Sequence, residues 1–265
     1  MKYLLGSKKE FLSFVNSIGK EDKVGIFTHT DLDGIASAVF MEEILKSKGI
    51  KPQLIEFLYL RIGMFEESIK KLRKNGITKI FMTDIGADLA DLEGFENLRK
   101  EVDCFLIDHH PIHADLKNKK NIIKTETGDC TSLVVYTLAK EFFGLENWEW
   151  LVCSATISDF SFKKKENLEF LKKNYPEIKG EENIFESEPG KISSQMVYAL
   201  IYFRGDEEKV YELIKEKDFK DLEKVYQIIK EEIKEQVDKF KKEAEFYPKR
   251  NLYFYYIKSR FNIPS

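Results

Sequence analysis

The chain has 265 residues, with 43 Lys and Arg against 46 Asp and Glu, and 43% of its residues are hydrophobic. This apolar content suffices for a core and excludes a disordered chain, while the net charge of −3 argues against a surface that is basic throughout. No apolar run reaches the roughly 18 residues of a membrane span, and the N-terminus lacks the apolar run of a secretory signal, so we expect a soluble, cytoplasmic protein.

The first half of the chain alternates short β-rich runs with stretches of helical periodicity. Strands are predicted over 24–28, 52–60, 77–84 and 102–108, and helices over 35–47, 64–76 and about 90–101. Near-continuous apolar runs suit strands that are buried on both faces. Strands separated by helices of this length therefore predict an α/β fold, with a parallel sheet covered by helices on both faces.

Beyond Thr125 the pattern becomes mainly helical. Helices are predicted over 131–144, 147–160 and 193–205, followed by a charged helical tract from 206 to about 247 and a strand over 251–259. The charged tract carries an apolar stripe on an otherwise polar surface, as expected of a long connecting helix, and it is broken near Asp218. Cys104, Cys130 and Cys153 lack C-x-x-C spacing, so we expect buried structural thiols.

Scarce polar side chains follow three of the predicted strands where each strand ends. All four histidines fall in two segments: His29 in FTHTDLDGIASA (27–38) and the other three in IDHHPIH (107–113). A third segment, MTDIGAD (82–88), contains Asp84. Because the carboxyl ends of parallel strands meet at the same edge of a sheet, we expect the three segments to face one cleft.

These segments combine carboxylates with imidazoles and contain no thiol. Their candidate ligands are Asp31, Asp33, Asp84, Asp108, His29 and His109. So many carboxylates would repel one another unless cations neutralise them. Mn²⁺ suits such ligands best, with Mg²⁺, Co²⁺ or Zn²⁺ as alternatives, and the set suffices for two metals that share a carboxylate. A helix cap explains Asp31 and Asp33 taken alone, but it does not explain three clusters at matching strand ends.

THTDLDG, the Asp of MTDIGAD, and DHH resemble the first three motifs of the DHH phosphoesterase family, over about residues 20–160. The similarity is greatest to its RecJ-like and oligonucleotide-degrading members. The resemblance implies one metal held by His29, Asp31 and Asp84, and a second held by Asp33, Asp84, His109 and a fourth-motif aspartate, with Asp84 bridging. Asp159, in SATISDF, matches that fourth motif.

The resemblance also implies two catalytic roles outside the metal ligands. Asp108 would orient the histidine pair, and His110 would reach the scissile phosphate. His113 has no counterpart in the family motifs, and we expect it to be exposed.

Substrate contacts are expected from two further segments. In TETGDCTSL (125–133), Asp129 or Thr131 fits a helix N-cap, and the family places this loop in the cleft, so Thr131 and Ser132 would lie near the substrate. Lys163 and Lys164 would contact backbone phosphates, with a solvated surface as the alternative.

The family pattern divides the chain into three parts. These are a DHH-like metal-binding catalytic domain over 1–185, a helical segment with a connecting helix over 186–248, and the first strand of a truncated C-terminal substrate-binding domain over 249–265. Relatives carry a Gly-rich stretch with a His in that last domain, but here no Gly follows Gly205 and no His follows His113. We therefore expect either a truncated chain or a different way of holding the substrate.

The sequence predicts a Mn²⁺-dependent phosphodiesterase, an exonuclease that hydrolyses single-stranded DNA or RNA or short oligonucleotides through two-metal activation of water. One alternative keeps the metals but takes a cyclic dinucleotide or a nucleotide 3′,5′-bisphosphate. A second alternative is non-enzymatic, because some relatives without activity are scaffolds bound to a replicative helicase. Those relatives have lost metal ligands, whereas none of the expected ligands is missing here.

Overall fold

The computed structural model describes residues 1–113, 116, 119–144 and 147–261. Its contacts divide the chain into two units, Met1–Ser193 and Ser194–Ser265. The three-part division expected from the sequence stays a prediction. Among the described residues, no helix combines the length and apolar character needed to cross a membrane.

The first unit is built on a six-stranded sheet. Its strands are β1 (Tyr3–Leu5), β2 (Val24–His29), β3 (Leu54–Leu58), β4 (Lys79–Thr83), β5 (Asp103–Asp108) and β6 (Ile122–Thr125). They lie in the order β1-β6-β5-β4-β2-β3, and every neighbouring pair is parallel except β1 with β6. The four strands predicted from the sequence are β2 to β5, while β1 and β6 were not predicted.

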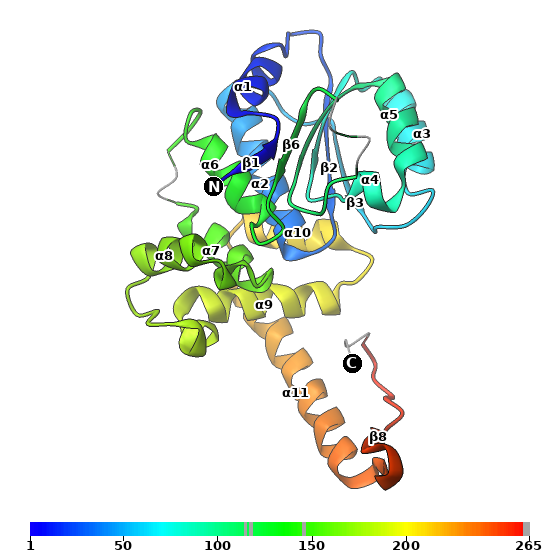
Figure 1. The fold of residues 1–265 in the computed structure, drawn as a ribbon, viewed down its shortest axis with the longest axis vertical. Helices are drawn as coiled ribbons and strands as arrows, with labels where there is room; N and C mark the ends of the chain where they lie inside the picture. The colour runs from blue at the N-terminus through cyan, green and yellow to red at the C-terminus, as the bar shows by residue number, and fades with distance from the viewer. Residues whose placement is uncertain (114–115, 117–118, 145–146, 262–265) are drawn as a thin grey trace. The chain divides into compact units, whose positions relative to one another are not determined.

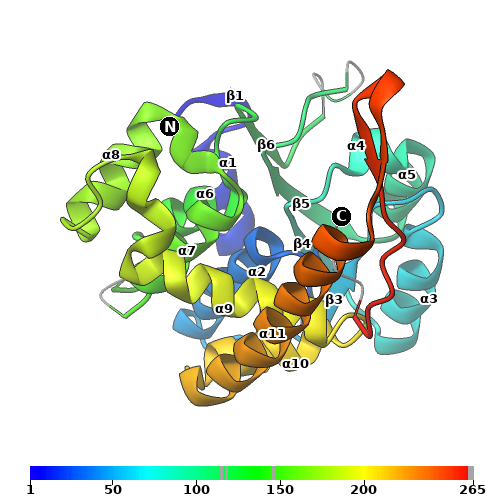
Figure 2. The ribbon, with the colours of Figure 1, turned by 90° about the horizontal axis from the view of Figure 1, so that it is seen from below.

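Helices cover both faces of this sheet (Figures 1 and 2). The helices of the first unit are α1 (Lys8–Asn16), α2 (Leu32–Ser47), α3 (Phe65–Asn75), α4 (Ala87–Ala90), α5 (Leu92–Glu101), α6 (Thr131–Ala139), α7 (Glu149–Ser158) and α8 (Lys165–Asn174), with short 3-10 helices η2 (Ser161–Lys163) and η3 (Glu181–Glu186). Of these, α8 packs against α7 and η2 and not on the sheet. Helix α9 (Glu188–Tyr202) crosses the boundary between the units. The predicted α/β class, with a largely parallel sheet between helical layers, is confirmed.

Each face of the sheet has its own core. On one face, α3 and α5 bury Phe65 and Phe95 in a cluster that contains Met82 of β4. On the other face, Phe11 of α1 packs edge-on against Phe81, with ring centroids 6.2 Å apart. Strands buried on both sides in this way explain the near-continuous apolar runs of the sequence.

The start of α2 depends on the residues that follow β2. Asp31 is the N-cap, and its Oδ1 accepts a hydrogen bond from the Gly34 amide at 2.9 Å. The helix therefore begins at Leu32, three residues before the predicted start. A Cβ at Gly34 would lie 2.4 Å from the carbonyl oxygen of His29, so only glycine permits the chain to turn this closely.

The order of the strands reverses at β2. This strand pairs with β3 on one side and β4 on the other, so the chain crosses from one half of the sheet to the other between β3 and β4. Such a reversal separates the loops that follow the two neighbouring strands and leaves a crevice at their carboxyl ends, which is where α/β sheets bind ligands.

The second unit contains two helices and a hairpin. Helices α10 (Glu207–Lys215) and α11 (Phe219–Glu243) confirm the predicted break near Asp218, whose side chain caps α11. The chain then forms β7 (Glu245–Tyr247), η4 (Pro248–Arg250) and β8 (Leu252–Phe254). The strand predicted over 251–259 is thus shorter than expected, because only three of its residues find a partner, in β7.

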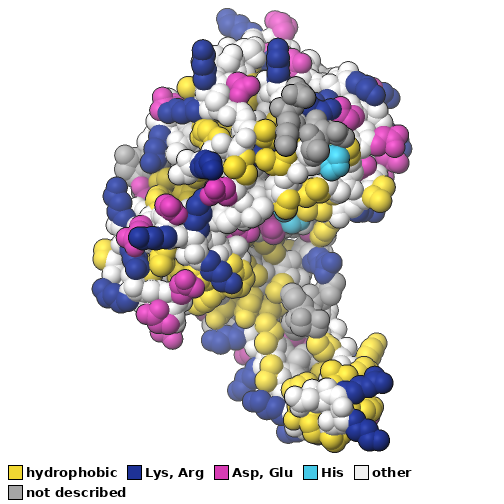
Figure 3. All heavy atoms as spheres, in the orientation of Figure 1, with side chains coloured by type: hydrophobic (Ala, Val, Ile, Leu, Met, Phe, Trp, Pro, Cys, Tyr) yellow, Lys and Arg dark blue, Asp and Glu magenta, His cyan; other side chains and the backbone are white. Residues whose placement is uncertain are grey.

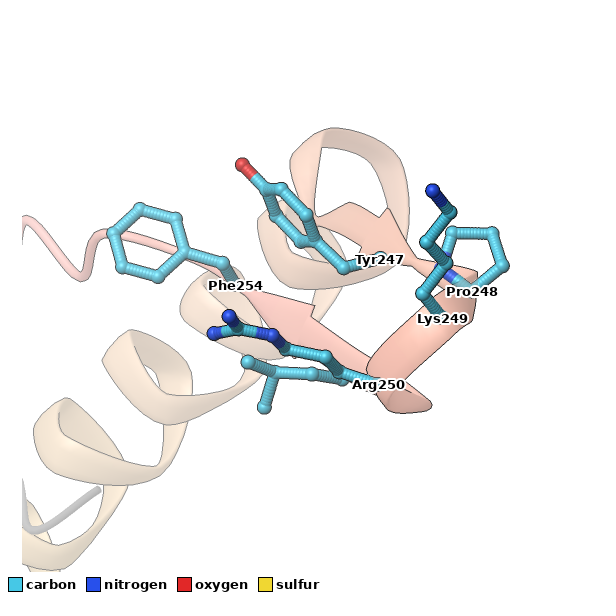
Figure 4. Close-up of a pocket in the computed structure, with 6 residues that line it drawn as sticks. Tyr247, Pro248, Lys249, Arg250 and Phe254 are labelled. Atoms are coloured by element: carbon cyan, nitrogen blue, oxygen red, sulfur yellow. The ribbon is translucent and has the colours of Figure 1, made fainter.

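The two faces of this hairpin differ. Tyr253 packs against Phe240 of α11, with ring centroids 6.1 Å apart. The opposite face borders a cavity of about 810 Å³ lined by Tyr247, Pro248, Lys249, Arg250, Leu252 and Phe254 (Figure 4). Figure 3 shows this end of the second unit as apolar side chains flanked by Lys and Arg.

Candidate metal centre

Three neighbouring strands deliver the polar side chains to one edge of the sheet. His29 is the last residue of β2, Asp84 directly follows β4, and Asp108 is the last residue of β5. Among the described residues, three sets of ligand atoms lie within 4.8 Å of one another: His29, Asp31 and Asp84; Asp33, His109 and Asp159; and Asp84, His109 and His110. The structure thus brings together all six residues that the resemblance implied as metal ligands.

Asp84 lies between the two histidines of this cluster. Its Oδ2 is 3.6 Å from Nδ1 of His29, and its Oδ1 is 3.3 Å from Nε2 of His109. The backbone at Asp84 has φ of +59°, a left-handed conformation that few non-glycine residues adopt. Burial raises the pKa of Asp84 well above its ordinary value, and the charges of Asp33 and Asp31 add to this rise.

Asp33 joins the start of α2 to the start of α6. Its two carboxylate oxygens accept hydrogen bonds from the backbone amides of Thr131 and Ser132, both at 2.8 Å, and from the Cys130 thiol. The sequence predicted a local cap for α6, from Asp129 or Thr131, and this is wrong. The N-cap is Cys130 and makes no side-chain capping bond, because Asp33, 98 residues before Thr131, satisfies the free amides.

Thr131 and Ser132, which were predicted to lie near the substrate, are completely buried. The Thr131 hydroxyl donates to Oδ1 of Asp84 at 3.1 Å, so this residue supports two of the candidate ligands, Asp33 through its amide and Asp84 through its side chain. A direct contact of Thr131 or Ser132 with substrate stays a prediction. The three cysteines are free and buried, as expected.

The charges in the cluster are poorly compensated by the protein alone. Burial by itself would lower the pKa values of His29 and His109, but the nearby carboxylates outweigh it and raise them to about 10 and about 11. Burial and the charge of Asp33 raise the pKa of Asp159 to about 7. Among the described residues, the buried atoms Nδ1 of His109 and Oδ2 of Asp84 have no hydrogen-bond partner, and Nδ1 of His29 lies 2.8 Å from the carboxylate of Asp31.

Buried polar atoms without partners, next to carboxylates that repel one another, are the condition that a bound cation relieves. The available atoms are carboxylate oxygens and imidazole nitrogens, which suit Mn²⁺ or Mg²⁺. The residues of this cluster therefore fit a divalent-metal site.

A second, fully buried network supports His110. Asp108 accepts a hydrogen bond from Nδ1 of His110 at 2.7 Å and pairs through its other oxygen with Nζ of Lys124. Lys124 also donates to Asp88 at 2.9 Å, and the side chains of Lys124, Asp88 and Asp108 do not reach solvent. Burial opposes ionisation of Asp108, but the bonds from His110 and Lys124 prevail and hold its pKa below the ordinary value.

The network agrees with the orienting role expected of Asp108, and it adds two residues that the sequence analysis missed. Lys124 lies in β6, where its charge hid the strand, and Asp88 belongs to the MTDIGAD segment already singled out. Asp88 also accepts from the backbone amide of His113, which is only partly exposed.

The two candidate phosphate-binding lysines differ. Lys164 forms ion pairs with Asp129 at 2.7 Å and with Glu126 at 2.9 Å. Lys163 is exposed, and its Nζ lies 5.3 Å from the ring centroid of Phe160. Lys164 is thus engaged in internal ion pairs, whereas Lys163 can meet a ligand. Phosphate contacts for both residues stay predictions.

Comparison with known proteins places this centre in a family. The DHH family, N-terminal domain, matches residues 23–159, just over half of the chain. The exonuclease RecJ bound to manganese superposes with a TM-score of 0.66 at 14% identity, covering 90% of this chain and 70% of that chain. A DHH domain described as belonging to a family of ribosomal proteins gives 0.66 at 16% identity, over 91% and 63%.

RecJ in complex with Mn²⁺ from Thermus thermophilus gives 0.60 at 13% identity, over 89% of this chain and 39% of that one. The chain thus spans less than two thirds of the last two structures. No curated protein matches it in sequence. Likeness at such identities establishes the fold, and the family match covers all three strand ends and Asp159. The chain belongs to the DHH family and is a metal-dependent phosphoesterase.

Proposed function

We propose that the protein is a two-metal phosphodiesterase that hydrolyses single-stranded nucleic acid or short oligonucleotides, with Mn²⁺ as its metal. His29, Asp31 and Asp84 would hold one ion, and Asp33, Asp84, His109 and Asp159 the other. When bound, such a pair of cations lowers the pKa of a water molecule and offsets charge on the phosphate. The observation that carries the proposal is the position of Asp84 between two histidines. One of its carboxylate oxygens lies 3.6 Å from Nδ1 of His29 and the other lies 3.3 Å from Nε2 of His109, so Asp84 could share one ion with each histidine.

The protein's own residues supply orientation and charge. The hydrogen bond that Nδ1 of His110 donates to Asp108 fixes the His110 ring. This bond and the charge of Asp108 raise the pKa of His110, against the effect of burial. The raised pKa favours the protonated form of His110, which is suited to stabilise negative charge on a non-bridging phosphate oxygen. Asp33 and Asp84 are fixed by α6, so the ligands are held in place before any ion arrives.

The test is hydrolysis of labelled single-stranded DNA and RNA with Mn²⁺, Mg²⁺ or Co²⁺, and with chelator. We expect Mn²⁺-stimulated cleavage, two ions per chain by titration, and loss of activity in Asp84→Ala without unfolding. Asp103→Ala is the matched control, because Asp103 begins β5 and its side chain is 70% exposed. Full turnover by Asp84→Ala at trace metal would refute the proposal. A cyclic dinucleotide and a nucleotide 3′,5′-bisphosphate, tested in parallel, distinguish the alternative substrates.

A further inference from the structure

An exposed aromatic platform, formed by Phe160 and Phe185, begins directly after the candidate ligand Asp159. The side chains of Phe160 and Phe185 are in contact, with ring centroids 6.0 Å apart. Both pack on the buried Phe162, at centroid distances of 5.8 and 5.9 Å. Phe160 is 53% exposed and Phe185 46% exposed, although residues of this size and apolarity usually lie inside.

Phe160 is the residue directly after the candidate ligand Asp159. Asp159 is the C-cap of α7, and its carboxylate accepts a hydrogen bond from Ser161 at 2.8 Å. Phe160 follows with φ of +55°, and its carbonyl accepts from the Lys163 amide at 3.2 Å. Because the left-handed conformation is unfavourable for a bulky side chain, this turn does not explain why a phenylalanine stands there.

The charges around the platform are uneven. Lys163 lies 5.3 Å from the centre of the Phe160 ring, and it forms no ion pair within the part of the chain that the structure describes. At the other end, Phe185 belongs to η3, which also contains Glu181, Glu182 and Glu186. An anionic ligand is therefore favoured at the Phe160 end and repelled at the Phe185 end.

We propose that Phe160 stacks on a base of the substrate strand next to the scissile phosphate, with Lys163 contacting the strand's backbone on the same side. This inference rests on the proposed nucleic-acid substrate and makes it more specific. An aromatic face accepts any base, since every base offers a π surface, and a nearby cation tracks the phosphates. The platform would thus favour base-bearing strands over other phosphodiesters without selecting a sequence.

The test combines Phe160→Ala with strands that lack one base, at each of the three terminal positions in turn. We expect Phe160→Ala to lower kcat/KM on the intact strand about 5- to 150-fold, the value of one stacked base, mainly through KM. At one position, removal of the base should cost the wild type a similar factor. Phe160→Ala should then cause little further loss on that abasic strand, because the two changes remove the same contact.

Leu4→Ala is the control, since Leu4 is an apolar residue that is 42% exposed and lies on β1, the edge strand of the sheet in the first unit. It should leave kcat/KM unchanged, and Phe160→Ala should leave the melting temperature and the Mn²⁺ affinity unchanged. Equal losses for Phe160→Ala on intact and abasic strands at every position would overturn the inference, as would an equal loss in Leu4→Ala.

A failure of the proposed function can be told apart from a failure of this inference. If the wild type cleaves no strand, the proposed substrate is wrong. Binding of a fluorescent, phosphorothioate-linked strand then tests Phe160 by itself through anisotropy. Weaker binding by Phe160→Ala, restored by Phe160→Trp, supports stacking, whereas equal affinity of wild type and Phe160→Ala overturns it.

Discussion

Replacement of Lys124 by methionine tests the buried network behind the metal centre. Met keeps most of the side-chain volume but removes the ammonium that Asp88 and Asp108 share. All three charged side chains are inaccessible to solvent, so no water can replace the lost partner. The variant would leave two buried carboxylates without their cation: Asp108 keeps the His110 ring as a partner, and Asp88 keeps the backbone amide of His113.

The expected cost is about 3–5 kcal/mol, the usual effect of removing one partner from a buried ion pair. A domain of ordinary stability, about 5–15 kcal/mol, would retain its fold with a reduced margin. The cost should be largest at neutral pH and fall as the pH drops below about 4. In the wild type, Asp108 has a lowered pKa, so its stabilising contribution is present above the ordinary carboxylate pKa and is lost in acid. In the variant, the carboxylates that have lost Lys124 can take up protons, which reduces the cost of burying them.

Urea unfolding followed by tryptophan fluorescence reports on the first unit, since Trp148 and Trp150 both lie there. Lys79→Met is the matched control: Lys79 lies on β4 and pairs with Asp103 at 3.0 Å, but that aspartate is 70% exposed. Its loss should cost less than about 1 kcal/mol. If Lys124→Met and Lys79→Met lower the free energy of unfolding by the same amount, the reasoning about burial is refuted.

Three further predictions concern the metal ligands. Thr131→Val removes the hydrogen bond to Asp84, so the Mn²⁺ affinity measured by calorimetry should fall about 10- to 100-fold. An unchanged affinity would show that Thr131 does not help to hold Asp84 in place for metal binding. His29 and His109, with pKa values raised to about 10 and about 11, are protonated in the metal-free protein at pH 7. Metal binding should therefore release about two protons and tighten as the pH rises. Calorimetry in buffers of different ionisation enthalpy would detect the proton release, and its absence would contradict the prediction. Added Mn²⁺ should raise the melting temperature in a concentration-dependent way that chelator reverses, and an unchanged melting temperature would argue against binding to the native state.

The sequence predicted the candidate site best where its residues lie at the end of a strand. His29, Asp84 and Asp108 could be assigned to one edge of a parallel sheet, because strand direction alone decides where such residues gather. The fourth motif, at Asp159, came from the resemblance alone, since its place at the end of α7 carries no periodic signal.

The residues that support the ligands could not be read from the chain in the same way. Asp33 caps α6 from 98 residues away, so a local search for a cap at Asp129 or Thr131 had to fail. Strand β6 was not predicted, and it contains Lys124, whose charge is compensated by Asp88 and Asp108 only in the folded protein.

Local patterns of apolar and polar residues thus determined the α/β class and most of the candidate ligands. The tertiary structure alone decided which buried charges find a partner and which polar atoms stay without one, because both depend on contacts between segments far apart in the chain. The buried atoms of His109 and Asp84 that lack a partner among the described residues, and the buried lysine behind His110, belong to this second kind of information.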